Sequence, residues 1–200
     1  MSVLATDTFN RADSSVLGSN WTTISGNAAH HILSNQALSP DDPSADYYNA
    51  VVWPNDQYSQ AIMVNAGDAA LGEDNGPGLC VRAAAAANTM YFAMFNNHGI
   101  DLYSVVASSY ANIGNYDTAQ ANNDVGYLEA QGTAIKCKQN GTQRISVTDS
   151  SIASGRAGLF GANEPSVNPL MDSWEGGDFT GGGGMSSRPP VQAWFNGRGH

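Results

Sequence analysis

Turn-forming residues recur roughly every 8 to 12 positions along this chain, and between them hydrophobic residues alternate with polar ones. A period of two places alternate side chains on opposite faces of an extended strand, so one face can be buried while the other meets water. The pattern predicts an all-β fold, an antiparallel β-sandwich (jelly roll) with an extended C-terminal arm and almost no helix. Strands are expected over residues 6–11, 21–25, 31–38, 47–53, 58–65, 78–84, 90–96, 100–107, 111–114, 125–131, 134–139, 142–148, 157–162 and 170–176.

Two hairpins stand out among these strands. Residues 90–107 turn through Asn97-His98-Gly99, and residues 134–148 turn at Asn140-Gly141. Asn-Gly accepts the positive φ angles of a type I′ turn, which matches the twist of the flanking strands. The alanine run 83–87 lies between a Gly-Pro-Gly bend and the strand 90–96. We therefore interpret this run as a strand end and a loop rather than a helix.

The composition limits which partners the chain can have. The length of 200 residues fits one sandwich around a single core, and the formal net charge is −10. An acidic protein repels a phosphate backbone, so nucleic-acid binding is not expected. No apolar run approaches the roughly 18 residues of a membrane span, and no signal peptide is recognised, so synthesis in the cytosol is expected. Cys80 and Cys137 each lie in a strand-like apolar run, and we expect buried free thiols.

Several segments resemble the concanavalin A-like lectin/glucanase superfamily, in particular the laminin-G-like jelly rolls of bacterial and phage proteins. The similar segments follow in order along the chain: 7–13, 17–21, 54–58, 78–82, 128–132, 140–141, 155–158 and 172–178. The resemblance spans about residues 6–179 and implies the jelly-roll fold. It does not select a function, because this superfamily includes lectins, carbohydrate-binding modules, glycosidases, lyases and virion proteins.

The carboxylates of a jelly-roll glycosidase are missing from the sequence. Glycosidases of this fold carry Glu-x-Asp-x-x-Glu, in which alternating positions place acidic groups on one concave face. The chain has only four glutamates, none with an acidic partner two residues away on an expected strand. The Tyr/His pair of the lyases of this fold has no diagnostic spacing here. The sequence therefore predicts a protein that is not an enzyme.

Calcium is the one cofactor that the resemblance leaves open, since related jelly rolls bind it through carboxylate and carbonyl oxygens. The candidate ligands are Asp7, Asp13 and Asp172, because the first and last strands of this fold usually pair. The alternative, which the sequence favours, is that Asp13 forms an Asx-turn and Asp172 is a solvated strand-end residue.

Glycan binding requires exposed aromatic rings on which a sugar can stack. Tyr110 and Tyr116 lie in an Asn-rich region, and Trp53 lies near a strand end. These three are the candidate carbohydrate-binding residues. The alternative is that they pack against the core, as large aromatic side chains usually do.

The C-terminal sequence differs from the rest of the chain. The expected units are a jelly roll over residues 1–180, a glycine hinge over 181–184 and an arm over 185–200. All eighteen acidic residues belong to the body, whereas the arm is basic and aromatic. We expect the arm to anchor a protein partner, either another copy in an oligomer or a larger particle, through Arg188, Pro189, Pro190, Val191, Trp194, Phe195 and Arg198.

Three functions are consistent with these features. The sequence-based hypothesis is a non-catalytic phage virion protein, such as a capsid decoration (cement) or tail/fibre protein, made in the host cytoplasm and attached through its arm. The alternative is a carbohydrate-binding module or lectin with glycan partners, located outside the cell or on its surface. A polysaccharide lyase or glycosidase is the third.

Overall fold

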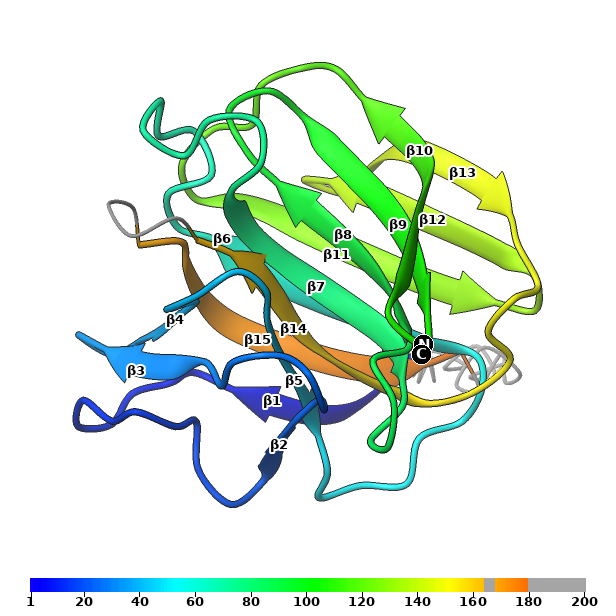
Figure 1. The fold of residues 1–200 in the computed structure, drawn as a ribbon, viewed down its shortest axis with the longest axis horizontal. Helices are drawn as coiled ribbons and strands as arrows, with labels where there is room; N and C mark the ends of the chain where they lie inside the picture. Colours follow the sequence, from blue (N-terminus) through cyan, green and yellow to red (C-terminus); the bar gives the residue numbers. More distant parts are fainter. Residues whose placement is uncertain (164–167, 180–200) are drawn as a thin grey trace, which may run out of the picture.

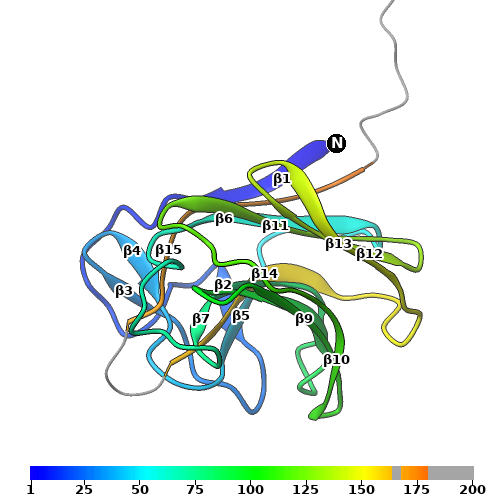
Figure 2. The same cartoon turned by 90° about the horizontal axis from the view of Figure 1, so that it is seen from above.

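The computed structural model describes residues 1–163 and 168–179. All regular elements in this part of the chain are β-strands, and they form two antiparallel sheets packed face to face (Figure 1; Figure 2). The expected all-β sandwich is confirmed. The predicted hinge and arm lie outside the described residues.

The two sheets divide the strands almost evenly. Sheet A has the order β13-β12-β11-β6-β15-β4-β3, with β1 added beside β15, and sheet B has the order β10-β9-β8-β7-β14-β5-β2. Sheet A contains β1 (Ser2–Asp7), β3 (His31–Leu33), β4 (Gln36–Leu38), β6 (Gln57–Met63), β11 (Asp124–Gln131), β12 (Ala134–Gln139), β13 (Thr142–Thr148) and β15 (Leu170–Asp178). Sheet B contains β2 (Trp21–Thr23), β5 (Ser44–Tyr48), β7 (Gly76–Ala83), β8 (Met90–Phe95), β9 (Ile100–Val106), β10 (Ser109–Tyr116) and β14 (Arg156–Ala162).

Both predicted hairpins form. Strands β8 and β9 pair from Phe95 and Ile100 outward, and β12 and β13 pair from Gln139 and Thr142 outward. Asn140 and Gly141 have φ angles of 50° and 78°, as a type I′ turn requires. The first and last strands pair as expected, with Asp7 opposite Trp174. The alanine run leaves β7 at Ala83 as a loop.

Three expected strands are wrong in their limits. The expected strand 47–53 is instead β5 at Ser44–Tyr48, and the chain continues as a loop to residue 56. The first strand covers Ser2–Asp7 rather than 6–11, because Phe9 takes a positive φ of 52° and its N–H donates to the Asp7 carboxylate. The expected strand 31–38 is instead a tight hairpin of β3 and β4. Ser34 and Asn35 both have positive φ angles and reverse the chain between these strands.

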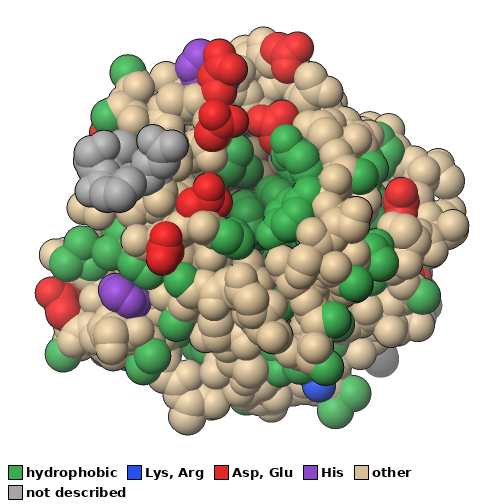
Figure 3. All heavy atoms as spheres, in the orientation of Figure 1, with side chains coloured by type: hydrophobic (Ala, Val, Ile, Leu, Met, Phe, Trp, Pro, Cys, Tyr) green, Lys and Arg blue, Asp and Glu red, His purple; other side chains and the backbone are tan. Residues whose placement is uncertain are grey.

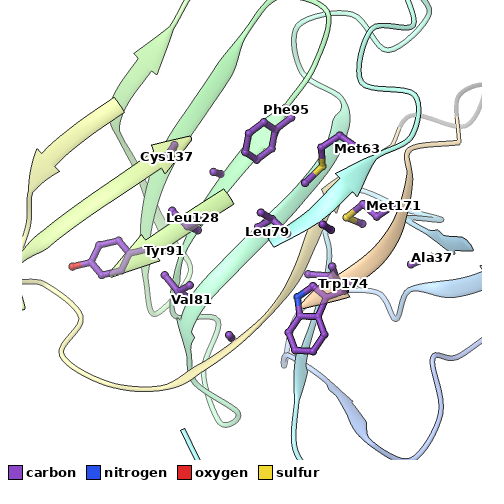
Figure 4. Close-up of a cluster of buried hydrophobic side chains, with 14 of the residues drawn as sticks. Ala37, Met63, Leu79, Val81, Tyr91, Phe95, Leu128, Cys137, Met171 and Trp174 are labelled. Atoms are coloured by element: carbon purple, nitrogen blue, oxygen red, sulfur yellow. The ribbon is translucent and has the colours of Figure 1, made fainter. Parts of the chain in front are cut away.

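The main hydrophobic core lies between the sheets (Figure 4). Leu79, Val81, Tyr91 and Phe95 enter it from sheet B, and sheet A supplies side chains that include Trp174. Trp174 is 1% exposed, and its indole N–H donates to the Ser59 hydroxyl at 2.9 Å. Each buried aromatic ring contributes about 1.5–3 kcal/mol, so this layer is the main source of stability.

A second hydrophobic cluster lies on the outer face of sheet B. Its strand members alternate with core residues, and they come from β5, β7, β8, β9 and β14. On β8, for example, Met90, Phe92 and Met94 belong to this cluster, whereas Tyr91 and Phe95 face the core between the sheets. Sheet B is therefore apolar on both faces, and the outer face needs a separate explanation.

The prediction that Cys80 and Cys137 are buried free thiols is confirmed. Cys80 belongs to the outer cluster and Cys137 to the core between the sheets. Burial raises the pKa of both thiols, so neither is poised to act as a thiolate nucleophile. The described residues include no helix long and apolar enough to cross a membrane.

Candidate binding site

A hollow of about 690 Å³ opens over the outer cluster of sheet B. In Figure 3 it appears as a depression with a hydrophobic floor and acidic side chains around part of its edge. Its lining comes from segments far apart in the sequence, namely Asp42, Pro43, Glu73, Asp74, Phe92, Met94, Asp101, Tyr103, Tyr110, Phe160 and Ala162. The volume lies within the range of small-molecule sites, about 300–1,000 Å³.

Three aromatic rings stand in a row in the floor. Phe92 stacks on Phe160 with ring centroids 3.7 Å apart, and on Tyr103 with centroids 5.0 Å apart. Phe92 and Tyr103 are directly paired residues of β8 and β9. Phe160 pairs with Gly78 of β7, where an added Cβ would lie 3.2 Å from the Phe160 ring. The glycine thus leaves room for a continuous aromatic floor.

Tyr110 forms an aromatic wall beside this floor. Its ring is inclined at 69° to Phe92, and its hydroxyl accepts a hydrogen bond of 3.0 Å from the Asn88 side chain. The residue is 45% exposed, whereas Phe92 and Phe160 are 4% and 3% exposed. A ligand in the hollow would therefore meet Tyr110 as its most accessible aromatic contact.

Carboxylates line the polar part of the hollow. Asp101 lies directly opposite Met94 in the β8–β9 pair, which places it at the edge of the aromatic floor. Burial raises the pKa of Asp101, and the nearby carboxylates of Asp117, Asp74 and Glu73 act in the same direction, against a hydrogen bond from Asn112. Glu73 also lies 3.3 Å from the His98 ring nitrogen. These groups can accept hydrogen bonds from hydroxyl groups or attract a cation.

The structure places the three predicted carbohydrate-binding residues in two different environments. Tyr110 lines the hollow. Tyr116, at the end of β10, packs on the core between the sheets, with the Arg144 guanidinium 4.9 Å from its ring centre. Trp53 also packs against that core, and its indole N–H donates to the Tyr48 carbonyl at 2.8 Å.

The candidate calcium ligands do not form a metal site. Asp7 accepts hydrogen bonds from the Arg11 guanidinium, the Trp21 indole and the Phe9 N–H. Asp13 accepts from the Ser34 N–H, and Asp172 from the Ser173 N–H. Within residues 1–163 and 168–179, no three His, Cys, Asp or Glu side chains are placed to hold one ion. Asp7, Asp13 and Asp172 are therefore not gathered around one ion in this part of the chain.

Two glutamates of sheet A are held in structural contacts. Glu129 bridges Lys136 and Lys138 at 3.1 and 2.8 Å, and Glu175 accepts a hydrogen bond of 2.6 Å from the Tyr58 hydroxyl. Neither lines the hollow. The carboxylates that line the hollow are Asp42, Glu73, Asp74 and Asp101.

Sequence reasoning missed Phe92, Phe160 and the role of the carboxylates around them. One signal for the floor was present, because residues 90–95 are apolar at every position. An unbroken apolar strand indicates burial on both faces. The sequence does not say whether protein or a ligand covers the second face.

Comparison with known proteins gives a fold and no family. No family model matches the chain, and no curated protein matches it. Carbohydrate-binding module CBM66 from Bacillus subtilis is similar in structure, with a TM-score of 0.58 and 21% identity over 78% of this chain and 96% of the module.

Two further solved structures share the architecture. The exoplasmic/lumenal domain of VIP36, in a Ca2+/Man-bound form, has a TM-score of 0.58 and 10% identity over 82% of this chain and 84% of that domain. The carbohydrate recognition domain of Emp46p, in a metal-free form, has a TM-score of 0.56 and 8% identity over 85% of this chain and 93% of that domain. A potassium-bound form of the Emp46p domain is also similar, with a TM-score of 0.53.

These likenesses agree with the concanavalin A-like lectin fold that the sequence segments predict. CBM66 is named as a carbohydrate-binding module and the Emp46p domain as a carbohydrate recognition domain. At 21% identity and below, the likeness shows the fold of this chain alone.

Proposed function

We propose that this protein is a non-catalytic carbohydrate-binding domain that holds a glycan in the hollow on the outer face of sheet B. The observation that carries the proposal is the combination of an aromatic floor and wall with a rim of carboxylates in one concave site. The named activities of structurally similar domains support this choice over a virion role. The virion hypothesis depends on the arm and stays a prediction.

The chemistry of the lining suits a sugar. The C–H groups of a pyranose or furanose ring form an apolar face that packs on an aromatic side chain, while its hydroxyls need hydrogen-bond partners. Tyr110 offers the accessible ring, and Asp101 and Asp74 offer acceptors beside it. A sugar hydroxyl that gives up its hydrogen bonds to water on binding can therefore donate to a carboxylate next to the aromatic rings.

Binding is tested by a glycan array followed by calorimetry on the strongest glycan. We expect Tyr110→Ala to weaken binding about tenfold or more, since loss of one aromatic contact costs roughly 1–2 kcal/mol. The control is Val52→Ala, because Val52 is 93% exposed and does not line the hollow. Equal affinity of Tyr110→Ala and the unchanged protein would contradict the proposed site, and absence of any glycan ligand would contradict the proposed function.

The protein is also expected to leave its glycan intact. Neither the sequence nor the hollow offers the acid pair of a jelly-roll glycosidase on one strand, since Asp101 and its carboxylate neighbours come from separate segments. Incubation with a panel of polysaccharides should release neither reducing ends nor unsaturated uronates. Release that Asp101→Asn or Glu73→Gln abolishes would show that the hollow is an active site.

A further inference from the structure

Among the residues that the structure describes, the lining of the hollow includes four carboxylates and no basic side chain. Asp42, Glu73, Asp74 and Asp101 line it, and neither lysine nor arginine does. A neutral hydroxyl that donates to a carboxylate leaves the negative charge of the site in place, whereas an ammonium group adds Coulomb attraction to the hydrogen bond and neutralises that charge. The rim is therefore better matched to a positively charged ligand than to a neutral one.

A second hollow extends the same acidic surface. It has a volume of about 300 Å³ and is lined by Glu73, His98, Gly99, Ile100, Asp101 and Asp117. Glu73 and Asp101 border both hollows. A ligand longer than one sugar ring can therefore lie on the aromatic floor and continue past these two residues without leaving the acidic surface.

Among the carboxylates of the hollow, Asp101 is the one whose charge a bound cation would stabilise most. It is partly buried and lies near Glu73, Asp74 and Asp117, and the Asn112 side chain donates a long hydrogen bond of 3.5 Å to it. Burial raises the pKa of this carboxyl, and its acidic neighbours raise it further. A bound ammonium group would relieve this repulsion, whereas an anionic uronate or sulfate group would add to it.

We propose that the hollow is selective for oligosaccharides that carry free amino groups. The inference rests on the proposed function and adds the substrate class. The sugar ring packs beside Tyr110 and over the aromatic floor, and the ammonium group lies among Asp101, Glu73 and Asp74. Both features are required, because the floor without the carboxylates would accept any sugar and the carboxylates without the floor would accept any cation.

The test compares two matched oligosaccharides by calorimetry on the full chain. One is a β-1,4-linked tetramer of glucosamine and the other is its N-acetylated counterpart, which has the same backbone and no charge. We expect the glucosamine tetramer to bind about tenfold more tightly at low salt, with the difference shrinking as added salt screens the partly exposed charges. A hexalysine peptide supplies positive charge without a sugar ring and should bind more weakly than the glucosamine tetramer.

Three variants locate the effect. Asp101→Asn and Glu73→Gln should each weaken binding of the glucosamine tetramer more than binding of the N-acetylated tetramer, and so reduce the preference between the two. The control is Asp13→Asn, which removes an exposed carboxylate outside both hollows. It should leave the preference unchanged, which separates a local effect from the general attraction of an acidic protein.

The outcomes distinguish failure of the charge selectivity from failure of the proposed function. Equal binding of the two tetramers, with both weakened by Tyr110→Ala, would overturn the charge selectivity and leave the proposed function intact. Hexalysine that binds as tightly as the glucosamine tetramer would also overturn it. If no oligosaccharide of the array binds at all, the proposed function itself fails.

Discussion

At the scale of single residues, Asp7 shows how one carboxylate organises the start of the fold. It joins Arg11, Trp21 and the backbone of Phe9 by hydrogen bonds, and Trp21 in turn lies 4.7 Å from Trp174 between ring centres. Burial by itself would raise the pKa of Asp7, but the hydrogen bonds from Arg11, Trp21 and Phe9 outweigh burial and lower it below its ordinary value of 3.8. Asp7 thus stabilises the fold as a carboxylate.

This shift predicts a defined pH dependence. Because the pKa is lower in the folded protein than in the unfolded chain, the contribution of Asp7 is present above about pH 4 and is lost as the pH falls through the folded-state pKa. We expect Asp7→Asn to lower the free energy of unfolding by about 1–2 kcal/mol at pH 7, and the difference from the unchanged protein to shrink in acid. Urea unfolding from pH 2 to pH 7 measures both. A difference that stays constant with pH would contradict the role of the charge, and Asp13→Asn is the control.

Individual site residues were only partly predictable. Tyr110 was selected because a tyrosine in an Asn-rich region was expected to be exposed, and it lines the hollow. Tyr116 satisfied the same criterion, and Trp53 was selected for its place near a strand end. Both pack on the core, because a period-two pattern does not say which of two faces looks outward. Asp101 could not be found from sequence, since it lies in β9 and its neighbours Glu73 and Asp74 lie on a loop distant in the sequence.

At the scale of elements, strand β14 depends on glycines to approach its neighbours. A Cβ at Gly158 would lie 2.0 Å from the Asp46 carbonyl oxygen of β5, so the two strands could not keep their present separation. Gly141 differs, because its φ is 78° and a Cβ there would meet no atom within 4 Å. Gly158 is therefore required because a side chain would clash with β5, whereas Gly141 is required because of its positive φ angle.

We predict different costs for alanine at these positions. Gly158→Ala should destabilise the fold by about 3 kcal/mol through forced strand separation, whereas Gly141→Ala should cost about 1 kcal/mol through the strained turn. Chemical denaturation of the two variants measures this order. The Gly158 variant should also bind glycan more weakly, because Phe160 follows two residues later on the same strand. Similar stability of both variants would contradict the close packing of β14 against β5.

Most strands and both hairpins could be predicted, because alternation and Asn-Gly turns are local signals. The first strand and the 31–38 segment were wrong because positive φ angles at Phe9, Ser34 and Asn35 interrupt sequences that alternate like strands. Such angles are unusual for residues other than glycine, and tertiary contacts such as the Phe9–Asp7 hydrogen bond hold them in place.

At the scale of the whole molecule, the hollow exists only because distant segments converge. Its lining is drawn from residues 42–43, 73–74, 92–94, 101–110 and 160–162, which the order of sheet B brings together. The all-β fold class was predicted from the alternation of hydrophobic and polar residues and from the turns. The concanavalin A-like superfamily was suggested by the resemblance of short segments. The pairing of β14 between β7 and β5, which completes the floor, is a long-range contact that these patterns do not encode.

The division between body and arm gives a further prediction. The last described strand ends at Asp178, so deletion of residues 185–200 should leave the unfolding free energy within about 0.5 kcal/mol of the full chain. Glycan affinity should also be unchanged. If the arm anchors a partner copy, light scattering of the truncated protein should show loss of the oligomer. A truncated chain that fails to fold would contradict the expected domain limits.

The central claim is that the outer face of sheet B binds carbohydrate. An amide-resolved NMR titration with the strongest glycan from the array tests it most directly, since it locates the ligand without any substitution. If the glycan lies in the hollow, we expect the perturbed amides to cluster on β8, β9 and β14 and in the loops that carry Asp42, Glu73 and Asp74. Perturbations confined to sheet A, or to the region around Trp53 and Arg156, would contradict it.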